Sequence, residues 1–204
     1  MMKTKIKICG LMNDRDIGFA NILMPDFIGF VFAGNSRRYV LPDKAAKLRE
    51  KLLPSVMAAG VFVNEKFDRV AGIAGHGVID FVQLHGEEDD DYIISLRKMT
   101  GKPIIKAYSI AGAEDVEKAV RSPADYILLD NGKGGTGKTF EWILAIGIER
   151  PFFLAGGLDV HNVRAALATA DPYAVDVSSG VEKEGVKDFE KMKSFMNAVR
   201  GYQI

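Results

Sequence analysis

The stretch Ile6-Lys7-Ile8-Cys9-Gly10 is the first of eight short apolar runs that recur along the whole chain. The runs are too continuous for strands with one face in water, so they predict strands that are buried on both faces. Most are followed by Gly, Asn or Ser. The eight runs are Ile6–Cys9, Phe27–Phe32, Met57–Val63, Phe81–His85, Ile104–Tyr108, Tyr126–Asp130, Phe152–Ala155 and Ala174–Val177.

A helical pattern follows each run. Asn13 is typical of a helix N-cap, and Pro42 suits the first turn of a helix. Eight strand–helix units in series predict an α/β fold, a single-domain (βα)8 TIM barrel over residues 1–204, with a doubly wound open sheet as the alternative. The expected helices are Asn13–Leu23, Pro42–Leu53, Glu65–Ala74, Glu88–Met99, Ala113–Val120, Thr139–Ile146, Val160–Ala168 and Asp188–Val199.

Composition limits the class of protein. The 204 residues are 48% hydrophobic, enough for the core of one domain, and Lys+Arg and Asp+Glu balance at 27 each. This balance gives no electrostatic reason to expect nucleic acid or an anionic membrane as a partner. One cysteine cannot form an internal disulfide, which favours a cytoplasmic protein. The apolar stretches are too short for a signal peptide or a membrane span.

Reactive side chains gather at the predicted carboxyl ends of the strands, where a TIM barrel carries its chemistry. Cys9 ends the first run and Asp130 ends the sixth. A thiol tuned by nearby charge acts as a base, and a carboxyl beside a buried strand suits a general acid. Facing one small substrate, the two groups would move protons in opposite directions, as aldose–ketose isomerisation requires. The plainer alternatives are a small buried cysteine and a loop-capping aspartate.

Lys7 lies two residues before Cys9 and is expected on the same, interior face of the barrel. From this position it either stabilises a thiolate at Cys9 or pairs with an acidic residue inside the barrel.

The ends of the seventh and eighth runs have the residues of a phosphate site. Backbone N–H groups of glycine-rich turns bind phosphate at this place in the fold, often with a short extra helix. The alternative is a pair of tight turns that merely need glycine. The candidate residues are Gly156, Gly157, Asp176, Ser178, Ser179 and Gly180.

Two further segments at the predicted carboxyl ends of the strands carry polar side chains. An arginine of Asn35-Ser36-Arg37-Arg38-Tyr39-Val40 can grip a carboxylate through two N–H groups. His85 ends the fourth run and either contacts substrate or is a hydrogen-bonded core group. His and carboxylate residues do not cluster at the spacing of metal ligands, so no metal is expected.

The stretch Gly132-Lys133-Gly134-Gly135-Thr136-Gly137-Lys138-Thr139 matches the Walker A pattern and lies between a predicted strand and helix. It belongs to the sixth of eight units, so little chain remains for a Walker B strand, and the helix after it is short. We therefore expect a flexible glycine-rich loop that closes near the substrate.

Together and in this order, these residues resemble the phosphoribosylanthranilate isomerase family over nearly the whole chain. The match runs from Lys7-Ile8-Cys9-Gly10 to Gly185-Val186-Lys187-Asp188. Its most specific pieces between these ends are Val82–Gly86, Leu129–Asp130 with Gly134–Gly137, Leu154–Leu158 and Asp176–Glu182. The family's Gly-Gly-Thr-Gly loop also explains the Walker A match.

The resemblance implies an Amadori rearrangement in tryptophan biosynthesis, which converts N-(5-phosphoribosyl)anthranilate into 1-(2-carboxyphenylamino)-1-deoxyribulose 5-phosphate. Asp130 would be the general acid and Cys9 the general base, and no cofactor would be needed. Arg38 would bind the anthranilate carboxylate, and Gly157, Ser179 and Gly180 would lie around the phosphate. The only partner expected is this small-molecule substrate, and the chain would be a monomer or a homodimer.

Two departures from the family pattern stand out. The family has Ser-Pro-Arg where this chain has Ser36-Arg37-Arg38, which makes Arg37 a rival of Arg38 for the carboxylate. The family's proline–glycine turn near the end is replaced by Glu184-Gly185.

The same residues distinguish this family from other phosphate-binding barrels. Indole-glycerol-phosphate synthase would have lysines at early strand ends, where this chain has Phe32 and Val63. Ribulose-phosphate epimerase would have metal ligands on several strand ends, and a bifunctional histidine/tryptophan isomerase would have an aspartate in place of Cys9. A barrel that binds a phosphosugar without turnover and a nucleotide-binding module are the non-enzymatic alternatives.

Overall fold

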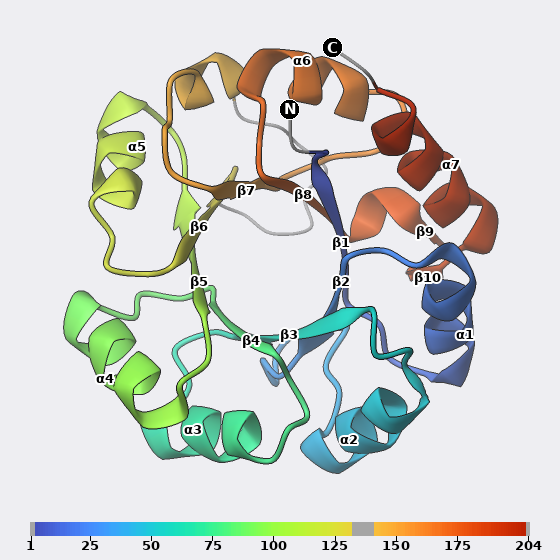
Figure 1. Cartoon of the computed structure of the whole chain (residues 1–204), viewed down its shortest axis with the longest axis vertical. Coiled ribbons are helices and arrows are strands. Elements are labelled where there is room, and N and C mark those ends of the chain that lie inside the picture. The colour runs from blue at the N-terminus through green and yellow to red at the C-terminus, as the bar shows by residue number, and fades with distance from the viewer. Residues whose placement is uncertain (1–2, 132–140, 203–204) are drawn as a thin grey trace.

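In a computed structural model, which describes residues 3–131 and 141–202, eight parallel strands close into a barrel in chain order (Figure 1). The open-sheet alternative is wrong because β8 pairs with β1, and the predicted single-domain TIM barrel is confirmed. The strands are β1 (Lys5–Cys9), β2 (Phe27–Val31), β3 (Met57–Phe62), β4 (Phe81–Leu84), β5 (Ile104–Ser109), β6 (Tyr126–Asp130), β7 (Phe152–Leu154) and β8 (Ala174–Val177).

In the described part of the chain, seven α-helices surround the barrel, and local sequence chemistry sets their ends. The Asn13 side chain caps α1 by accepting from the backbone N–H of Asp16, and Pro42 begins α2. Asp188 caps α7 by accepting from Lys191. The helices are α1 (Asp14–Leu23), α2 (Pro42–Lys51), α3 (Phe67–Gly75), α4 (Asp90–Thr100), α5 (Ala113–Val120), α6 (Val163–Ala170) and α7 (Phe189–Arg200).

The predicted helix Thr139–Ile146 is wrong for the part that the structure describes. A short 3-10 helix, η1 (Trp142–Ala145), stands there instead. Gly147 follows with a φ of +82°, a left-handed conformation that stops helix growth within a few residues. The pattern of apolar residues predicted a helix with a buried face, but Ile143 and Ile146 are largely exposed. The Walker A match, residues 132–139, lies outside the described residues.

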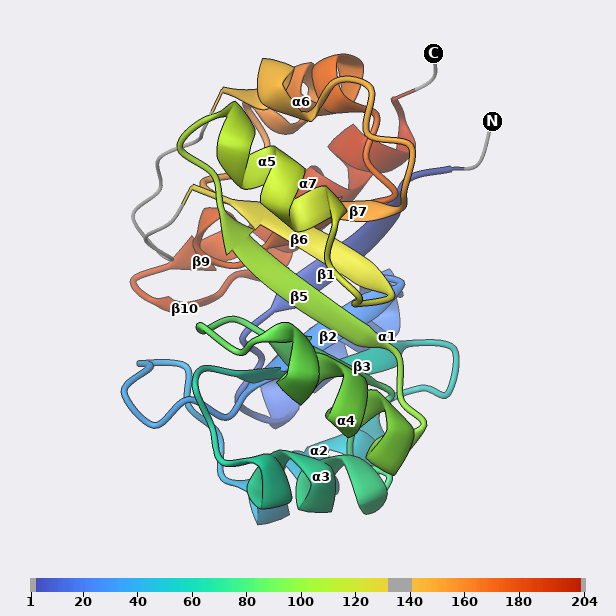
Figure 2. The ribbon, with the colours of Figure 1, turned by 90° about the vertical axis from the view of Figure 1, so that its left-hand side faces the viewer.

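The chain after β8 forms a second 3-10 helix, η2 (Ser179–Val181), and a two-stranded hairpin of β9 (Glu182–Lys183) and β10 (Val186–Lys187). Figure 2 shows this hairpin on the side of the barrel where the strands end, opposite the side where β1 begins. The hairpin therefore borders the rim on which the predicted site residues lie.

The side chains inside the barrel change from aromatic to small along the barrel axis. Aromatic rings fill the end where the strands begin: Phe27 packs against Phe81 and Phe153 with ring centroids 5.3 and 5.5 Å apart. Toward the carboxyl ends, small residues such as Ala107 and Ala155 take over. The aromatic end supplies packing, and the small residues leave room for a cavity at the other end.

Every helix within residues 3–131 and 141–202 is too short or too polar to cross a membrane.

We expect Phe153→Ala to lower the free energy of unfolding by about 3 to 5 kcal/mol, because it empties a fully buried ring position among other aromatic rings. Urea denaturation followed by circular dichroism measures this. Met99→Ala, at a largely exposed position of α4, is the control and should change the value by less than about 0.5 kcal/mol. Equal effects of the two substitutions would contradict this account of the core.

Candidate active site

A cavity of about 230 Å³ opens at the carboxyl ends of the strands, and nine of the ten predicted site residues line it. The strands that carry them are far apart in the sequence and meet only because the barrel closes. The nine residues are Cys9, Arg38, His85, Asp130, Gly156, Gly157, Asp176, Ser178 and Ser179.

Gly180, the tenth predicted residue, does not line the cavity but packs against the loop that does. A Cβ atom at this position would collide with the carbonyl oxygen of Leu158, so only glycine lets η2 pack against the loop after β7. Gly156 and Gly157 have φ values of +83° and +64°, which most side chains do not tolerate. The Ser178 hydroxyl is used structurally, since it donates to the carbonyl of Cys9 at 3.0 Å.

Lys7 pairs with an acid inside the barrel, the second of its two predicted alternatives. Its side chain is fully buried, and Nζ lies 2.8 Å from Oδ2 of Asp176. Burial of the Lys7 ammonium alone would lower its pKa, but Asp176 and Cys9 together raise it. The lysine is therefore held in its charged form.

Cys9 is partly exposed, and its thiol has a raised pKa. Burial of the sulfur raises the pKa most, Lys7 lowers it, and the Asp176 carboxylate raises it again. Burial, helped by the Asp176 carboxylate, therefore outweighs Lys7 and favours the thiol form of Cys9 in the free protein.

Asp130 is buried, with one hydrogen-bonded oxygen and one that faces His85. Oδ1 accepts a hydrogen bond from the backbone N–H of Asn131 at 2.7 Å, and Oδ2 lies 3.5 Å from Nε2 of His85. A Cβ atom on Gly156 would come within 2.8 Å of Oδ1. The glycine that follows β7 therefore makes room for the carboxyl that ends β6.

The structure separates the two rival arginines. Arg38 lines the cavity with its side chain 12% exposed, whereas the Arg37 side chain is 59% exposed and does not line it. Arg38 holds Glu182 by two bonds, Nε to Oε1 at 2.7 Å and Nη2 to Oε2 at 2.9 Å. This pairing uses two of its five N–H groups and fixes the plane of the guanidinium.

The sequence did not identify Glu182 as a site residue, although it ends the stretch Asp176–Glu182 that carries several predicted ones. Its carboxylate also accepts from Lys187 at 2.7 Å and from Arg37 at 2.9 Å. Burial alone would raise the pKa of Glu182, but Arg38 and Lys187 outweigh this and lower it. Glu182 is therefore ionised and joins the β2–α2 loop to the hairpin after β8.

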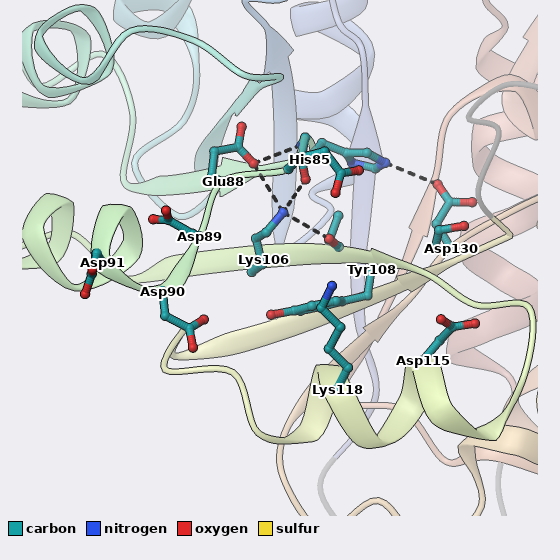
Figure 3. Close-up of a pocket in the computed structure, with 14 residues that line it drawn as sticks. His85, Glu88, Asp89, Asp90, Asp91, Lys106, Tyr108, Asp115, Lys118 and Asp130 are labelled. Atoms are coloured by element: carbon teal, nitrogen blue, oxygen red, sulfur yellow. Dashed lines mark hydrogen bonds and ion pairs between the residues drawn. The ribbon is translucent and has the colours of Figure 1, made fainter.

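A second cavity, of about 660 Å³, lies beside the first at the ends of β4 and β5 (Figure 3). His85 and Asp130 line both cavities. The second cavity is also lined by the buried pair Lys106 and Glu88, whose Nζ and Oε2 atoms are 3.2 Å apart. Among residues 3–131 and 141–202, no group of His, Cys, Asp and Glu is arranged to hold a metal ion.

The model of the N-(5'phosphoribosyl)anthranilate (PRA) isomerase family matches residues 6–198. The chain belongs to this family. It is 45% identical over 203 residues to the N-(5'-phosphoribosyl)anthranilate isomerase of Thermoanaerobacter pseudethanolicus, a match that covers 97% of this chain and 98% of the relative. The family assignment makes the chain an isomerase of tryptophan biosynthesis with a TIM-barrel fold.

Two solved structures of family members carry further information. One, 36% identical with a TM-score of 0.88, is a phosphoribosyl anthranilate isomerase in complex with reduced 1-(o-carboxyphenylamino)-1-deoxyribulose 5-phosphate. Another, also 36% identical with a TM-score of 0.88, shows monomers generated from the dimeric enzyme of Thermotoga maritima. Each match covers 98% of this chain and 100% of the other.

We expect Asp176→Asn to lower the pKa of the Cys9 thiol, because the positive charge of Lys7 then faces the sulfur without a competing carboxylate. Thiolate ultraviolet absorbance against pH measures this, and the chain has one cysteine, so the signal has one source. Asp171→Asn, an exposed aspartate, is the control with the same chemical change. An unchanged or higher thiol pKa in Asp176→Asn would contradict this balance of charges.

Proposed function

We propose that this chain converts N-(5-phosphoribosyl)anthranilate into 1-(2-carboxyphenylamino)-1-deoxyribulose 5-phosphate by an Amadori rearrangement, with Cys9 as general base and Asp130 as general acid. The observation that carries the proposal is that this thiol and carboxyl line one cavity between a glycine-rich loop pair and an arginine. The family structure in complex with the reduced form of this product supports the choice of substrate.

The order of strands around the barrel suggests how the substrate lies. The glycine-rich loops follow β7 and β8, Cys9 ends β1, and Arg38 follows β2, so Cys9 stands between the two anion-binding ends. With its phosphate at Gly157 and η2 and its carboxylate at Arg38, the substrate brings its sugar carbons to the thiol. Backbone N–H groups suit the phosphate, and a guanidinium suits the carboxylate.

The reaction begins when Asp130 gives a proton to the ring oxygen of the sugar. The bond between C1 and this oxygen breaks, and the lone pair of the anthranilate nitrogen forms a protonated imine at C1. Deprotonated Cys9 then removes the proton on C2, and the electrons of the C–H bond move into the imine to give an enolamine. The imine is the electron sink, so these steps need no cofactor.

The final step restores both groups. C1 takes a proton from the Cys9 thiol, and the hydroxyl on C2 loses its proton to the Asp130 carboxylate, which leaves the ketone. Each group has then given and received one proton, and the reaction is balanced without any other reactant. Because burial raises the pKa of Cys9, the thiolate is a minor species at neutral pH, and its amount rises with pH.

We expect Cys9→Ser and Asp130→Asn each to lower kcat by about 100-fold or more, because each removes a group that transfers a proton in the proposed reaction. The loss of fluorescence of freshly made phosphoribosylanthranilate measures turnover. For the wild type, kcat/KM should still rise with pH above neutrality, and this rise should be missing in Cys9→Ser.

Circular dichroism melting of both variants controls for folding. A folded variant that keeps full activity would refute the role of that residue, and an inactive wild type would refute the proposed function.

We expect Arg38→Ala to lower kcat/KM by about 10- to 100-fold, mainly by raising KM, because a charge-assisted bond to the substrate carboxylate contributes about 1.5 to 3 kcal/mol. Arg37→Ala is the matched control and should stay within about twofold, since its side chain is largely exposed and does not line the cavity. Glu182 keeps Lys187 as a partner in both variants. The reverse ranking would assign the carboxylate to Arg37.

A further inference from the structure

We propose that Gln83 and His85 are positioning residues that act through Asp130: Gln83 fixes the tautomer of the His85 ring, and His85 holds the acid. This inference rests on the proposed function of Asp130 and adds two residues to it. It starts from a pair of side chains on neighbouring positions of the β4 end, one buried and one facing both cavities.

The contact between Gln83 and His85 determines where the ring carries its proton. Nε2 of Gln83 lies 3.0 Å from Nδ1 of His85, and an amide nitrogen can only donate. In this orientation of the Gln83 amide Nδ1 is the acceptor, which places a single ring proton on Nε2. Gln83 is 1% exposed, so its amide cannot turn away into water.

The other side of the ring faces the acid. Nε2 of His85 lies 3.5 Å from Oδ2 of Asp130, and Figure 3 shows the ring pointing toward this carboxyl. Hydrogen bonds of catalytic groups are often long without substrate and shorten when it binds. With its proton on Nε2, His85 donates to Oδ2 and stabilises the carboxylate that forms when Asp130 gives its proton to the sugar ring.

Within residues 3–131 and 141–202, the two oxygens of Asp130 have different neighbours. Oδ1 accepts from the backbone N–H of Asn131, and Oδ2 faces His85, which is therefore placed to orient it. The opposite tautomer would present a lone pair at Nε2 and repel the carboxylate when it forms. A change of tautomer should therefore slow the chemical step and leave substrate binding nearly unchanged.

The tautomer can be read directly by long-range ¹H–¹⁵N correlation NMR at about pH 8. The chain has three histidines, and His76 is an internal reference of the opposite kind. Its Nδ1 lies 2.5 Å from the carbonyl oxygen of Gly72 and must donate to it. His76→Gln, far from both cavities, assigns the signals and should keep full activity.

The expected spectrum shows His85 protonated on Nε2 and His76 protonated on Nδ1. A His85 ring protonated on Nδ1, or one that averages between the two tautomers, would overturn the inference. This result does not depend on activity, so it stands apart from any failure of the proposed function, which an inactive wild type would show.

Gln83→Glu tests the consequence with a side chain of the same shape. Its carboxylate accepts a proton from Nδ1, so the His85 signals should change to the Nδ1-protonated or doubly protonated pattern. We expect kcat to fall by about tenfold or more, with KM within about twofold. A changed tautomer with unchanged kcat would refute the positioning role.

A second pair of variants tests the donor itself in case Gln83→Glu does not fold. His85→Gln keeps an N–H group that can reach Asp130, whereas His85→Leu does not, and the His85 side chain is 30% exposed, so both should fold. We expect His85→Gln to retain clearly more kcat than His85→Leu. Equal losses in two folded variants would refute donation to Asp130.

Discussion

The buried ion pair between Lys7 and Asp176 is the constraint on which the rest of the site depends. It lies where the barrel closes, because the pairing of β1 with β8 sets Lys7 directly opposite Asp176. A fully buried ammonium without a partner is strongly destabilising, so the pair demands the register of the last strand against the first. That register brings the loop after β8 next to Cys9.

The same pair decides the chemistry of the thiol. Burial of the sulfur opposes a thiolate most strongly, Lys7 favours one, and Asp176 opposes it again. The charges of Lys7 and Asp176 therefore stabilise the closed barrel, and the sulfur of Cys9 stays protonated. In the proposed rearrangement Cys9 takes and returns a proton, and a raised pKa makes its thiolate the stronger base for the uptake step.

A second ionic cluster fixes the other side of the cavity. Glu182 accepts from Arg38, Arg37 and Lys187, and so ties a loop after β2 to the hairpin after β8. The bidentate contact with Glu182 orients Arg38 before any ligand arrives, which reduces the ordering that binding would require. Rigid charge pairs therefore frame the site, while the aromatic end of the barrel supplies the packing beneath it.

The sequence by itself determined the eight strands, the ends of most helices and the rim residues. These follow from local rules: apolar runs bury strands, Asn13 and Asp188 cap helices, and the carboxyl ends of parallel strands must share one rim. Only the tertiary structure decided the partner of Lys7, the place of Arg38 rather than Arg37 in the cavity wall, the raised pKa of the thiol and the contact of Gln83 with His85. The reason is physical: Lys7 and Asp176 are 169 residues apart, and burial and electrostatics depend on distance in space, which local patterns do not contain.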